Sequence, residues 1–299
     1  SYNSGLIMYP IILQIGNFQI SSYGFMLMMA FIINNILLKR YLISIGEKGK
    51  IAEDLIFYAA IGGIIGAKLF YIIEYYDSGG YSNIQGLVSI FKGLFTFNLN
   101  LLLSGINKFG SGLVFLGGLF GGACSITYYI YKNNLSWTKV SDWVAPYIIL
   151  GQGIGRLGCF FVGCCYGKPT TLSWLFPFTN GRPPTTYESF KYNHPEIFNS
   201  LVKPFYNVGD FIRVHPTQLY EFFIYFFIFL YLLKIRSIKK YNGQVFLEYL
   251  FLAAFSRFLI EYIRLNPTYL FNLTSAQILS LLMIVCSMII MYLRRQHIK

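Results

Sequence analysis

Residues 143–163 read WVAPYIILGQGIGRLGCFFVG, an apolar run that is interrupted by one charged side chain, Arg156. An α-helix needs roughly 20 apolar residues to cross the ~30 Å hydrocarbon core of a bilayer, and this run has that length. Similar runs recur along the chain. The stretch therefore predicts a membrane-spanning helix, and its buried arginine indicates a polar site within that helix.

The composition is that of a membrane protein. Of the 299 residues, 55% are hydrophobic and 12% are charged, whereas a soluble domain has roughly 45–50% and about 25%. The net charge of +12 comes from basic residues that lie mainly between the hydrophobic runs. This placement is typical of topology signals and of contact with anionic headgroups. We therefore expect membrane lipids, and no nucleic acid, as partners.

The apolar runs predict an all-α polytopic membrane protein, with residues 1–299 forming a single transmembrane domain of about seven transmembrane helices. Residues 84–104 are apolar but are broken by Lys92 and Gly93, so we expect an interfacial or re-entrant helix there rather than an eighth crossing. No cleavable signal peptide is visible in Ser1 to Gly16, so the first span is expected to direct insertion. The expected spans are near 21–38, 54–76, 112–131, 143–163, 216–233, 244–264 and 276–293.

Basic residues in the short loops predict the orientation. The loops near 39–50, 132–139, 234–240 and 294–299 carry these residues, and all four fall on one side of the predicted membrane. By the positive-inside rule this side is cytoplasmic, so we expect a cytoplasmic C-terminus and an N-terminus outside. The long segment 164–215 is then an outward-facing, extracytoplasmic loop subdomain.

Glycines at GxxxG spacing occur in several of the predicted helices. Such spacing lets helix backbones approach closely, so we interpret these glycines as packing contacts within a monomeric bundle. The pairs are Gly62 with Gly66, Gly117 with Gly121, Gly118 with Gly122, and Gly151 with Gly155.

Three basic residues lie away from the ends of the predicted spans, and a basic residue at the centre of a span costs on the order of 2.5–3.5 kcal/mol on insertion scales. Lys68 lies late in the second span, where it has either a snorkelling or a functional role. Gly151, Gly155 and Gly158 line one helix face beside Arg156, and bare backbone next to a guanidinium makes a space that a ligand headgroup can enter. The alternative for Arg156 is a buried structural ion pair.

The third basic residue, Arg257, belongs to SRFLIEYIR, residues 256–264. Arg257, Glu261 and Arg264 are spaced i, i+4 and i+7 and share one helix face. Glu261 can pair with either arginine and leave the other free for an anion. Because the planar guanidinium donates two parallel hydrogen bonds to a phosphate, two arginines from different helices form a phosphate clamp. In a membrane the most abundant phosphate is that of a phospholipid.

The segment HPTQLYE, residues 215–221, begins the fifth predicted span. Pro216 suits the first turn of a helix, and several polar side chains follow it at the membrane boundary. Capping and anchoring is one interpretation of this segment. Ligand contact is the other, because His215 is one of three histidines in the chain.

The order of these motifs resembles the prolipoprotein diacylglyceryl transferase family over nearly the whole chain. The resemblance implies a bacterial plasma (inner) membrane enzyme that transfers the diacylglyceryl group of phosphatidylglycerol to the lipobox cysteine thiol of a preprolipoprotein signal peptide and releases glycerol phosphate. The matching pieces are SSYGFML (21–27), IIGAKLFYI (64–72), LVFLGGLFGG (113–122), VAPYIILGQGIGRLGCF (144–160), HPTQLYE (215–221) and SRFLIEYIR (256–264).

Residue by residue, the resemblance implies that Arg156 and Arg257 are the essential arginines, with Glu261 as acidic partner and Tyr23 as a phenol that bonds the headgroup or the thiol. The resemblance and the residue analysis together give two sets of candidates, one for catalysis and one for phosphatidylglycerol binding. The catalytic candidates are Arg156, Arg257, Glu261, His215 and Tyr23. The binding candidates are Arg156, Arg257, Tyr23, Gly155, Gly158, Gln218 and Tyr220.

The chain departs from the family pattern at the expected general base. The histidine of the family's SFHGG corresponds to Leu116, and the asparagine and glutamate of GNFxNGE correspond to Cys159 and Cys164. His215 is a hypothetical substitute base, and a thiol whose pKa is lowered by two arginines needs little help. Cys159, Cys164 and Cys165 have three interpretations: apolar packing, metal or redox chemistry, and a covalent lipid intermediate. We expect no cofactor and no metal.

Two other function classes compete with the transferase. A lipid-binding or transport protein of the same fold without transferase activity is favoured by the missing histidine. A membrane thiol oxidoreductase is favoured by the adjacent Cys164 and Cys165.

Overall fold

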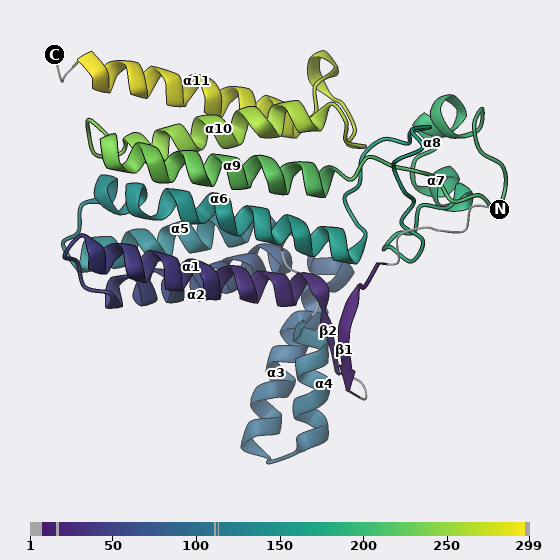
Figure 1. The fold of residues 1–299 in the computed structure, drawn as a ribbon. Helices are drawn as coiled ribbons and strands as arrows, with labels where there is room; N and C mark the ends of the chain where they lie inside the picture. The colour runs from purple at the N-terminus through teal and green to yellow at the C-terminus, as the bar shows by residue number, and fades with distance from the viewer. Residues whose placement is uncertain (1–7, 16–17, 111, 113, 297–299) are drawn as a thin grey trace. The chain divides into compact units, whose positions relative to one another are not determined.

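The computed structural model describes residues 8–15, 18–110, 112 and 114–296. A long helix lies at each of the seven predicted spans, so their helical nature is confirmed (Figure 1). Four of these helices, α1, α2, α6 and α11, are long and apolar enough to cross a membrane. The long helices are α1 (Ser22–Ser44), α2 (Lys50–Glu74), α5 (Phe115–Lys132), α6 (Trp137–Val162), α9 (Thr217–Ile238), α10 (Gln244–Glu261) and α11 (Ser275–Gln296).

Two compact units make up the chain: residues 1–38 with 141–299, and residues 39–140. The sequence had suggested one transmembrane domain. The N-terminus that we expect on the outer side falls in residues 1–7, outside the described residues.

In the unit 39–140, glycines bring α2 and α5 into backbone contact. A Cβ at Gly66 would overlap the carbonyl oxygen of Gly117 and lie 2.8 Å from Cα of Gly121. A Cβ at Gly62 would lie 2.5 Å from the carbonyl oxygen of Gly121. The GxxxG pairs of these two helices therefore pack against each other, as their spacing predicted.

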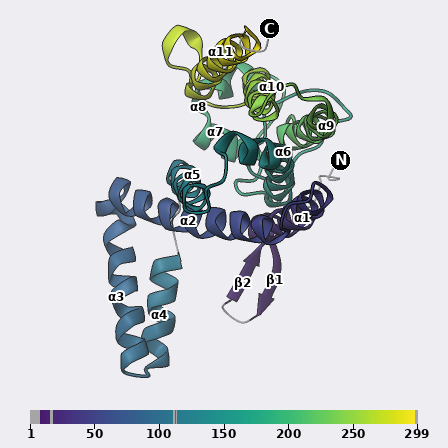
Figure 2. The ribbon, with the colours of Figure 1, turned by 90° about the vertical axis from the view of Figure 1, so that its left-hand side faces the viewer.

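Residues 84–104 form a pair of helices where one was expected. Helices α3 (Tyr81–Phe95) and α4 (Leu99–Gly110) lie side by side, and the π-helical turn η1 (Tyr76–Gly80) joins them to α2 (Figures 1 and 2). At 1.5 Å per residue they are roughly 22 and 18 Å long, shorter than the hydrocarbon core. Lys68 is buried and donates hydrogen bonds to the Asn83 side chain and the Phe109 carbonyl oxygen, so it ties both helices to α2.

In the other unit, α6, α9, α10 and α11 lie side by side (Figures 1 and 2). Helix α6 starts six residues before the predicted span, and these added turns include Asp142, whose carboxylate is buried. It accepts hydrogen bonds from the backbone N–H groups of Gly243 and Phe246, at 2.8 and 3.1 Å, and from Lys239 at 2.8 Å. Asp142 thus satisfies the free N–H groups at the start of α10.

One two-stranded hairpin departs from the expected all-α fold. Strands β1 (Ile11–Ile15) and β2 (Phe18–Ser21) pair antiparallel directly before α1 (Figure 1). The sequence predicted no element there, because these strands are too short to give a clear period-two pattern.

Residues 163–216 carry short elements around a small apolar core: α7 (Tyr187–Asn193), α8 (Pro195–Ile197) and the π-helical turn η2 (Phe198–Val202). A further 3-10 turn, η3 (Leu270–Asn272), precedes α11. This core explains why a polar, Pro-containing segment folds at all. Its buried residues are Met8, Tyr166, Phe178, Phe190, Phe198, Val202, Ile212 and Val214.

We predict that Gly66→Ala destabilises the α2–α5 pair, because the added methyl group meets backbone atoms that cannot rotate away. The expected loss is about 1–3 kcal/mol, the usual cost of overpacking. Thermal unfolding of the purified chain in detergent measures it. Gly63→Ala is the matched control on the same helix, since its Cβ would lie 3.6 Å from the nearest backbone oxygen. Equal unfolding temperatures for the two variants would contradict the prediction.

Candidate functional site

A buried carboxylate on α9 holds two arginines from different helices. Oε2 of Glu221 lies 2.6 Å from Nε of Arg156 on α6, and Oε1 lies 2.8 Å from Nη1 of Arg257 on α10. The Glu221 side chain is 1% exposed, whereas both arginine side chains are 23% exposed. The two guanidinium groups therefore converge on one carboxylate, and both arginine side chains remain partly exposed.

A second carboxylate orients the same cluster from α10. Oε2 of Glu261 lies 2.9 Å from Nη2 of Arg257, the i, i+4 pair that the helix period predicted. Its Oε1 accepts a hydrogen bond of 2.5 Å from the Asn266 side chain. Because each Arg257 terminal nitrogen has its own carboxylate, the guanidinium plane is fixed.

Arg264 supplies the cluster with unused hydrogen-bond donors. Its guanidinium lies 3.9 Å from Glu221 and 3.8 Å from Glu261, beyond hydrogen-bond distance. Its Nε and Nη1 are buried and have no hydrogen-bond partner among the described residues. With both carboxylates ionised, Arg156, Arg257 and Arg264 leave the cluster with one surplus positive charge, which favours an anionic ligand.

The glycines beside Arg156 do not all line the space that the sequence predicted. Among the residues that the structure describes, a Cβ at Gly155 would meet nothing within 4 Å, so this position is open. A Cβ at Gly158 would lie 3.2 Å from Tyr23 and Met26, and one at Gly151 would lie 2.7 Å from Asn34. Gly151 and Gly158 thus pack against α1, whereas Gly155, on the same helix face between them, does not. Of the three, only Gly155 borders a space next to Arg156.

Tyr23 begins α1 and lies beside the cluster. Its side chain is 44% exposed, and its phenol is within electrostatic reach of Arg156 and of the three cysteines that follow that arginine. Gly158 packs closely against this position, since a Cβ there would lie 3.2 Å from Cα of Tyr23.

His215, Tyr220 and Gln218 stand apart from the arginines. Nδ1 of His215 lies 3.3 Å from the Tyr220 hydroxyl, and burial lowers the pKa of the imidazole from its ordinary value. Among the described residues, neither side chain bonds a member of the arginine cluster. Gln218 is fully buried, and its amide donates a 2.5 Å hydrogen bond to the Cys164 carbonyl oxygen. Its role in this structure is to hold that loop.

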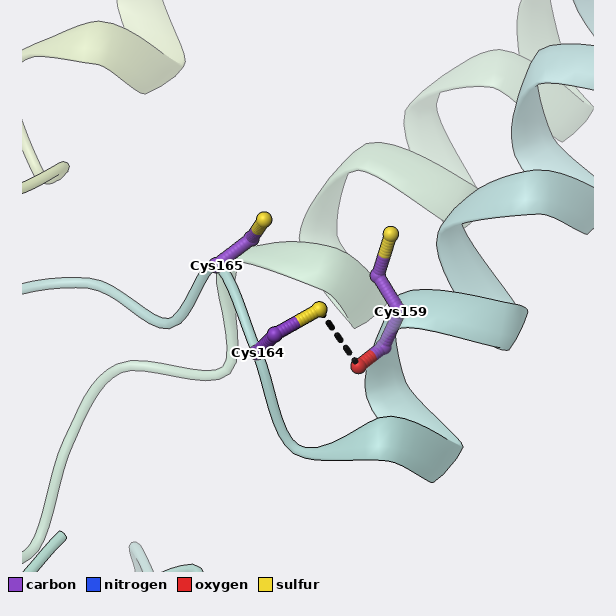
Figure 3. Close-up of side chains that lie close together, drawn as sticks. All are labelled: Cys159, Cys164 and Cys165. Carbon is purple, nitrogen blue, oxygen red and sulfur yellow. Dashed lines mark hydrogen bonds between the residues drawn. The ribbon is translucent and has the colours of Figure 1, made fainter. Parts of the chain in front are cut away.

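Three cysteines gather where α6 ends. The sulfur atoms of Cys159, Cys164 and Cys165 all lie within 4.8 Å of one another, and Figure 3 shows them turned toward a common space. All three are free thiols, and Cys165 is exposed. A left-handed backbone at Gly163 (φ 72°) and Cys165 (φ 62°) folds the chain back onto α6. Burial as apolar packing therefore does not account for Cys165.

Leu116, at the position of the family's histidine, lies on α5 with a side chain that is 53% exposed. It carries no group that accepts a proton.

Glu221 is the main site residue that the sequence analysis missed. The motif HPTQLYE drew attention to the outer start of α9, but Glu221 was not placed among the catalytic candidates. A count of charges inside the spans would have found it. Arg156 has no acidic residue on its own helix within i±4, so its partner must come from another span, and Glu221 and Glu261 are the acidic residues with comparable burial there.

Comparisons with known proteins agree on one family. The family model for prolipoprotein diacylglyceryl transferase matches residues 10–293. A protein of Clostridium tetani is 31% identical over 293 residues, which is 96% of this chain and 98% of that protein. A protein of Bordetella avium is 29% identical over 260 residues, covering 85% of this chain and 81% of its own length. Both are named phosphatidylglycerol–prolipoprotein diacylglyceryl transferase.

We predict that Glu221→Gln lowers the stability of the folded chain, because it leaves two arginines without their shared anion. Removal of one partner of a buried ion pair costs about 3–5 kcal/mol, so the unfolding temperature in detergent should fall markedly. Glu248→Gln on α10 is the control, because Glu248 bonds Tyr231 at an exposed position. A fall no larger than that of the control would mean that Glu221 is dispensable.

Proposed function

This chain belongs to the prolipoprotein diacylglyceryl transferase family, and we infer from this membership that it transfers the diacylglyceryl group of phosphatidylglycerol to a cysteine thiol of a prolipoprotein. Glycerol phosphate is the second product. The relatives with this printed name align over most of the chain. The observation that carries the assignment to particular residues is the pair of arginines that converge on Glu221.

The chemistry needs a group that stabilises a departing phosphate. The cysteine sulfur attacks the glyceryl carbon next to the phosphate, the carbon–oxygen bond breaks, and its electron pair stays on the phosphate oxygen. Negative charge therefore grows on the leaving group in the transition state. Positioned cations that face this charge stabilise it more strongly than they stabilise the bound substrate, and this difference accelerates the reaction.

Arg156 and Arg257 are the proposed phosphate ligands. Glu221 and Glu261 bond one side of these guanidinium groups, so the remaining N–H groups point to a defined place. Arg264 adds the unused donors. The open position at Gly155 gives the headgroup room next to Arg156.

Tyr23 is proposed to bond the headgroup or the incoming thiol, since it is exposed beside Arg156. His215 and Tyr220 lie just before and within the first turns of α9, at the expected membrane boundary. Because they bond each other and not the cluster, we assign them to headgroup contact rather than to proton removal. Gln218 holds the cysteine loop through its hydrogen bond to Cys164, and Gly158 lets α1 pack closely against α6.

We propose a multi-pass topology in the bacterial inner membrane with seven crossings. The N-terminus and residues 164–215 face outward, and the C-terminus is cytoplasmic. The loop charges support this orientation. In that arrangement the arginine cluster lies toward the outer ends of α6, α9 and α10, where a lipobox cysteine at the outer end of a signal peptide would arrive.

Replacement of either clamp arginine is predicted to abolish most of the transfer activity. Arg156→Lys and Arg257→Lys keep the charge but lose the two-pronged hydrogen bonding, so the rate should fall by about 10²–10³, as for loss of an oxyanion-binding donor. The measurement is transfer of diacylglycerol from labelled phosphatidylglycerol to a lipobox peptide by the purified chain in detergent.

Arg295→Lys, in the last turn of α11, is the matched control for this assay and should keep wild-type activity. Rates within about threefold of wild type for both clamp variants would remove the phosphate-clamp argument. No transfer by well-folded wild-type chain would favour the lipid-binding or transport alternative.

We predict that a protease added outside the cell cleaves only the loops that face outward, so cleavage reports the orientation of the chain in the membrane. A recognition site for a specific protease, inserted between Val208 and Gly209, should be cut when the protease is added to intact spheroplasts. The same site between Tyr241 and Asn242 should be cut only after the cells are lysed. The reverse pattern would overturn the positive-inside assignment.

A further inference from the structure

We propose that Cys159, Cys164 and Cys165 bind one zinc ion, and that the open fourth position of this ion takes the substrate cysteine thiol. The proposal rests on the transferase function inferred above and names the group that activates its nucleophile. It revises the expectation that the chain binds no metal. It also provides an activating group for a chain that has leucine where the family pattern has histidine.

The geometry of the three thiols suits a single ion. Zinc binds thiolate sulfur at about 2.3 Å in a tetrahedral arrangement, which separates the sulfur atoms by roughly 3.8 Å. The three sulfur atoms lie within 4.8 Å of one another, so small side-chain rotations close the site (Figure 3). Three protein ligands and one open position are the pattern of catalytic zinc sites, whereas structural sites have four protein ligands.

The backbone holds the cysteines in place before any ligand arrives. The amide of Cys164 donates to the Cys159 carbonyl oxygen at 3.1 Å, so the loop folds onto the last turn of α6. From α9, Thr217 donates to the Cys165 carbonyl oxygen at 2.8 Å, and Gln218 donates to that of Cys164 at 2.5 Å. Such outer contacts orient metal ligands. The left-handed backbone at Cys165 is rare for a residue with a side chain, and it turns the third thiol toward the other two.

The charges around the three thiols favour the state in which they bind zinc. Zinc with three thiolates carries one net negative charge, and the neighbouring arginine cluster carries one surplus positive charge. Arg264 and Arg156 lie within electrostatic reach of Cys165. Thiolates are the form that binds metal.

The proposed ion lies next to the phosphate clamp. Cys159 follows Arg156 by three residues on α6, and side chains with this spacing are neighbours on one helix face. Cys165 is exposed, so the site is open on one side to a further ligand. A thiolate bound to the ion would therefore reach the same lipid molecule whose phosphate Arg156 binds.

The reaction balances without a side-chain base. The substrate thiol loses its proton to water when its sulfur binds zinc, because coordination deprotonates a thiol at neutral pH. The sulfur then bonds the glyceryl carbon, and the carbon–oxygen bond to phosphate breaks. The electron pair leaves with glycerol phosphate, and the thioether product, a weaker ligand than a thiolate, dissociates from the ion. Nothing is oxidised or reduced.

The first test is the metal content of the full chain, purified in detergent under reducing conditions and dialysed against zinc. We expect about one zinc ion per wild-type chain and at least tenfold weaker binding by Cys159→Ser, Cys164→Ser and Cys165→Ser. Cys124→Ser on α5 and Cys286→Ser on α11 are the matched controls, since both residues are exposed free thiols outside the cluster, and they should bind zinc as wild type does. Wild type that binds no zinc, or serine variants that bind it normally, would overturn the proposal.

The second test follows the substrate thiol. In the cobalt-substituted chain, sulfur ligation gives absorption bands from sulfur-to-metal charge transfer. A lipobox peptide should change these bands, whereas the same peptide with serine in place of cysteine should leave them unchanged. Identical spectra with the two peptides would refute ligation of the substrate.

Measurements of transfer activity distinguish a failure of the zinc proposal from a failure of the transferase function on which it rests. Removal of zinc by a chelator should lower the transfer rate by about 10²–10⁴, the range for loss of a group that handles the reacting proton, and added zinc should restore it. Arg156→Lys should lose transfer but keep zinc. Transfer that persists in the metal-free chain would refute the zinc step alone. Zinc binding and peptide ligation without any lipid transfer would refute the assigned reaction and leave the metal site standing.

Discussion

The carboxylate of Glu221 is the group on which the whole site depends. It is nearly inaccessible to solvent, and it bonds one arginine from α6 and another from α10. Three arginines packed this closely would repel one another strongly in a medium of low dielectric constant. With Glu221 and Glu261 present, the helices can pack while the cluster keeps a positive surplus. One acidic residue therefore serves both the fold and the anion-binding capacity of the cluster.

The same arrangement explains why some of the long helices are less apolar than others. Helix α10 carries Arg257 and Glu261, which are needed at the site and which lower its hydropathy. Helix α2 and helix α11 carry no part of the cluster, and both are apolar enough to cross a membrane by length and composition. Helix α6 carries Arg156 and still has the length and composition of a membrane span, so a single cluster charge does not remove that character.

Local patterns were enough to predict the helices, close packing at the GxxxG glycines, and a site built on Arg156 and Arg257. What the sequence could not supply were the particular partners of these groups in distant segments. The choice of Glu221 as common partner depends on which helix faces meet. The hydrogen-bond donors of the buried Asp142 carboxylate lie about a hundred residues away. The cysteines have no metal-ligand spacing along the chain, and only a left-handed turn at Gly163 and Cys165 brings their sulfur atoms together.

The first turns of α9 have a consequence for control of the protein. Thr217 and Gln218 hold the cysteine loop, and one turn later Glu221 holds the arginines. A small axial shift or local fraying of this segment would release both groups of side chains at the same time. Loss of helical structure in these turns would therefore disrupt the cysteine loop and the arginine cluster together. A compound that binds at the start of α9 and displaces it would inactivate the protein without resembling either substrate.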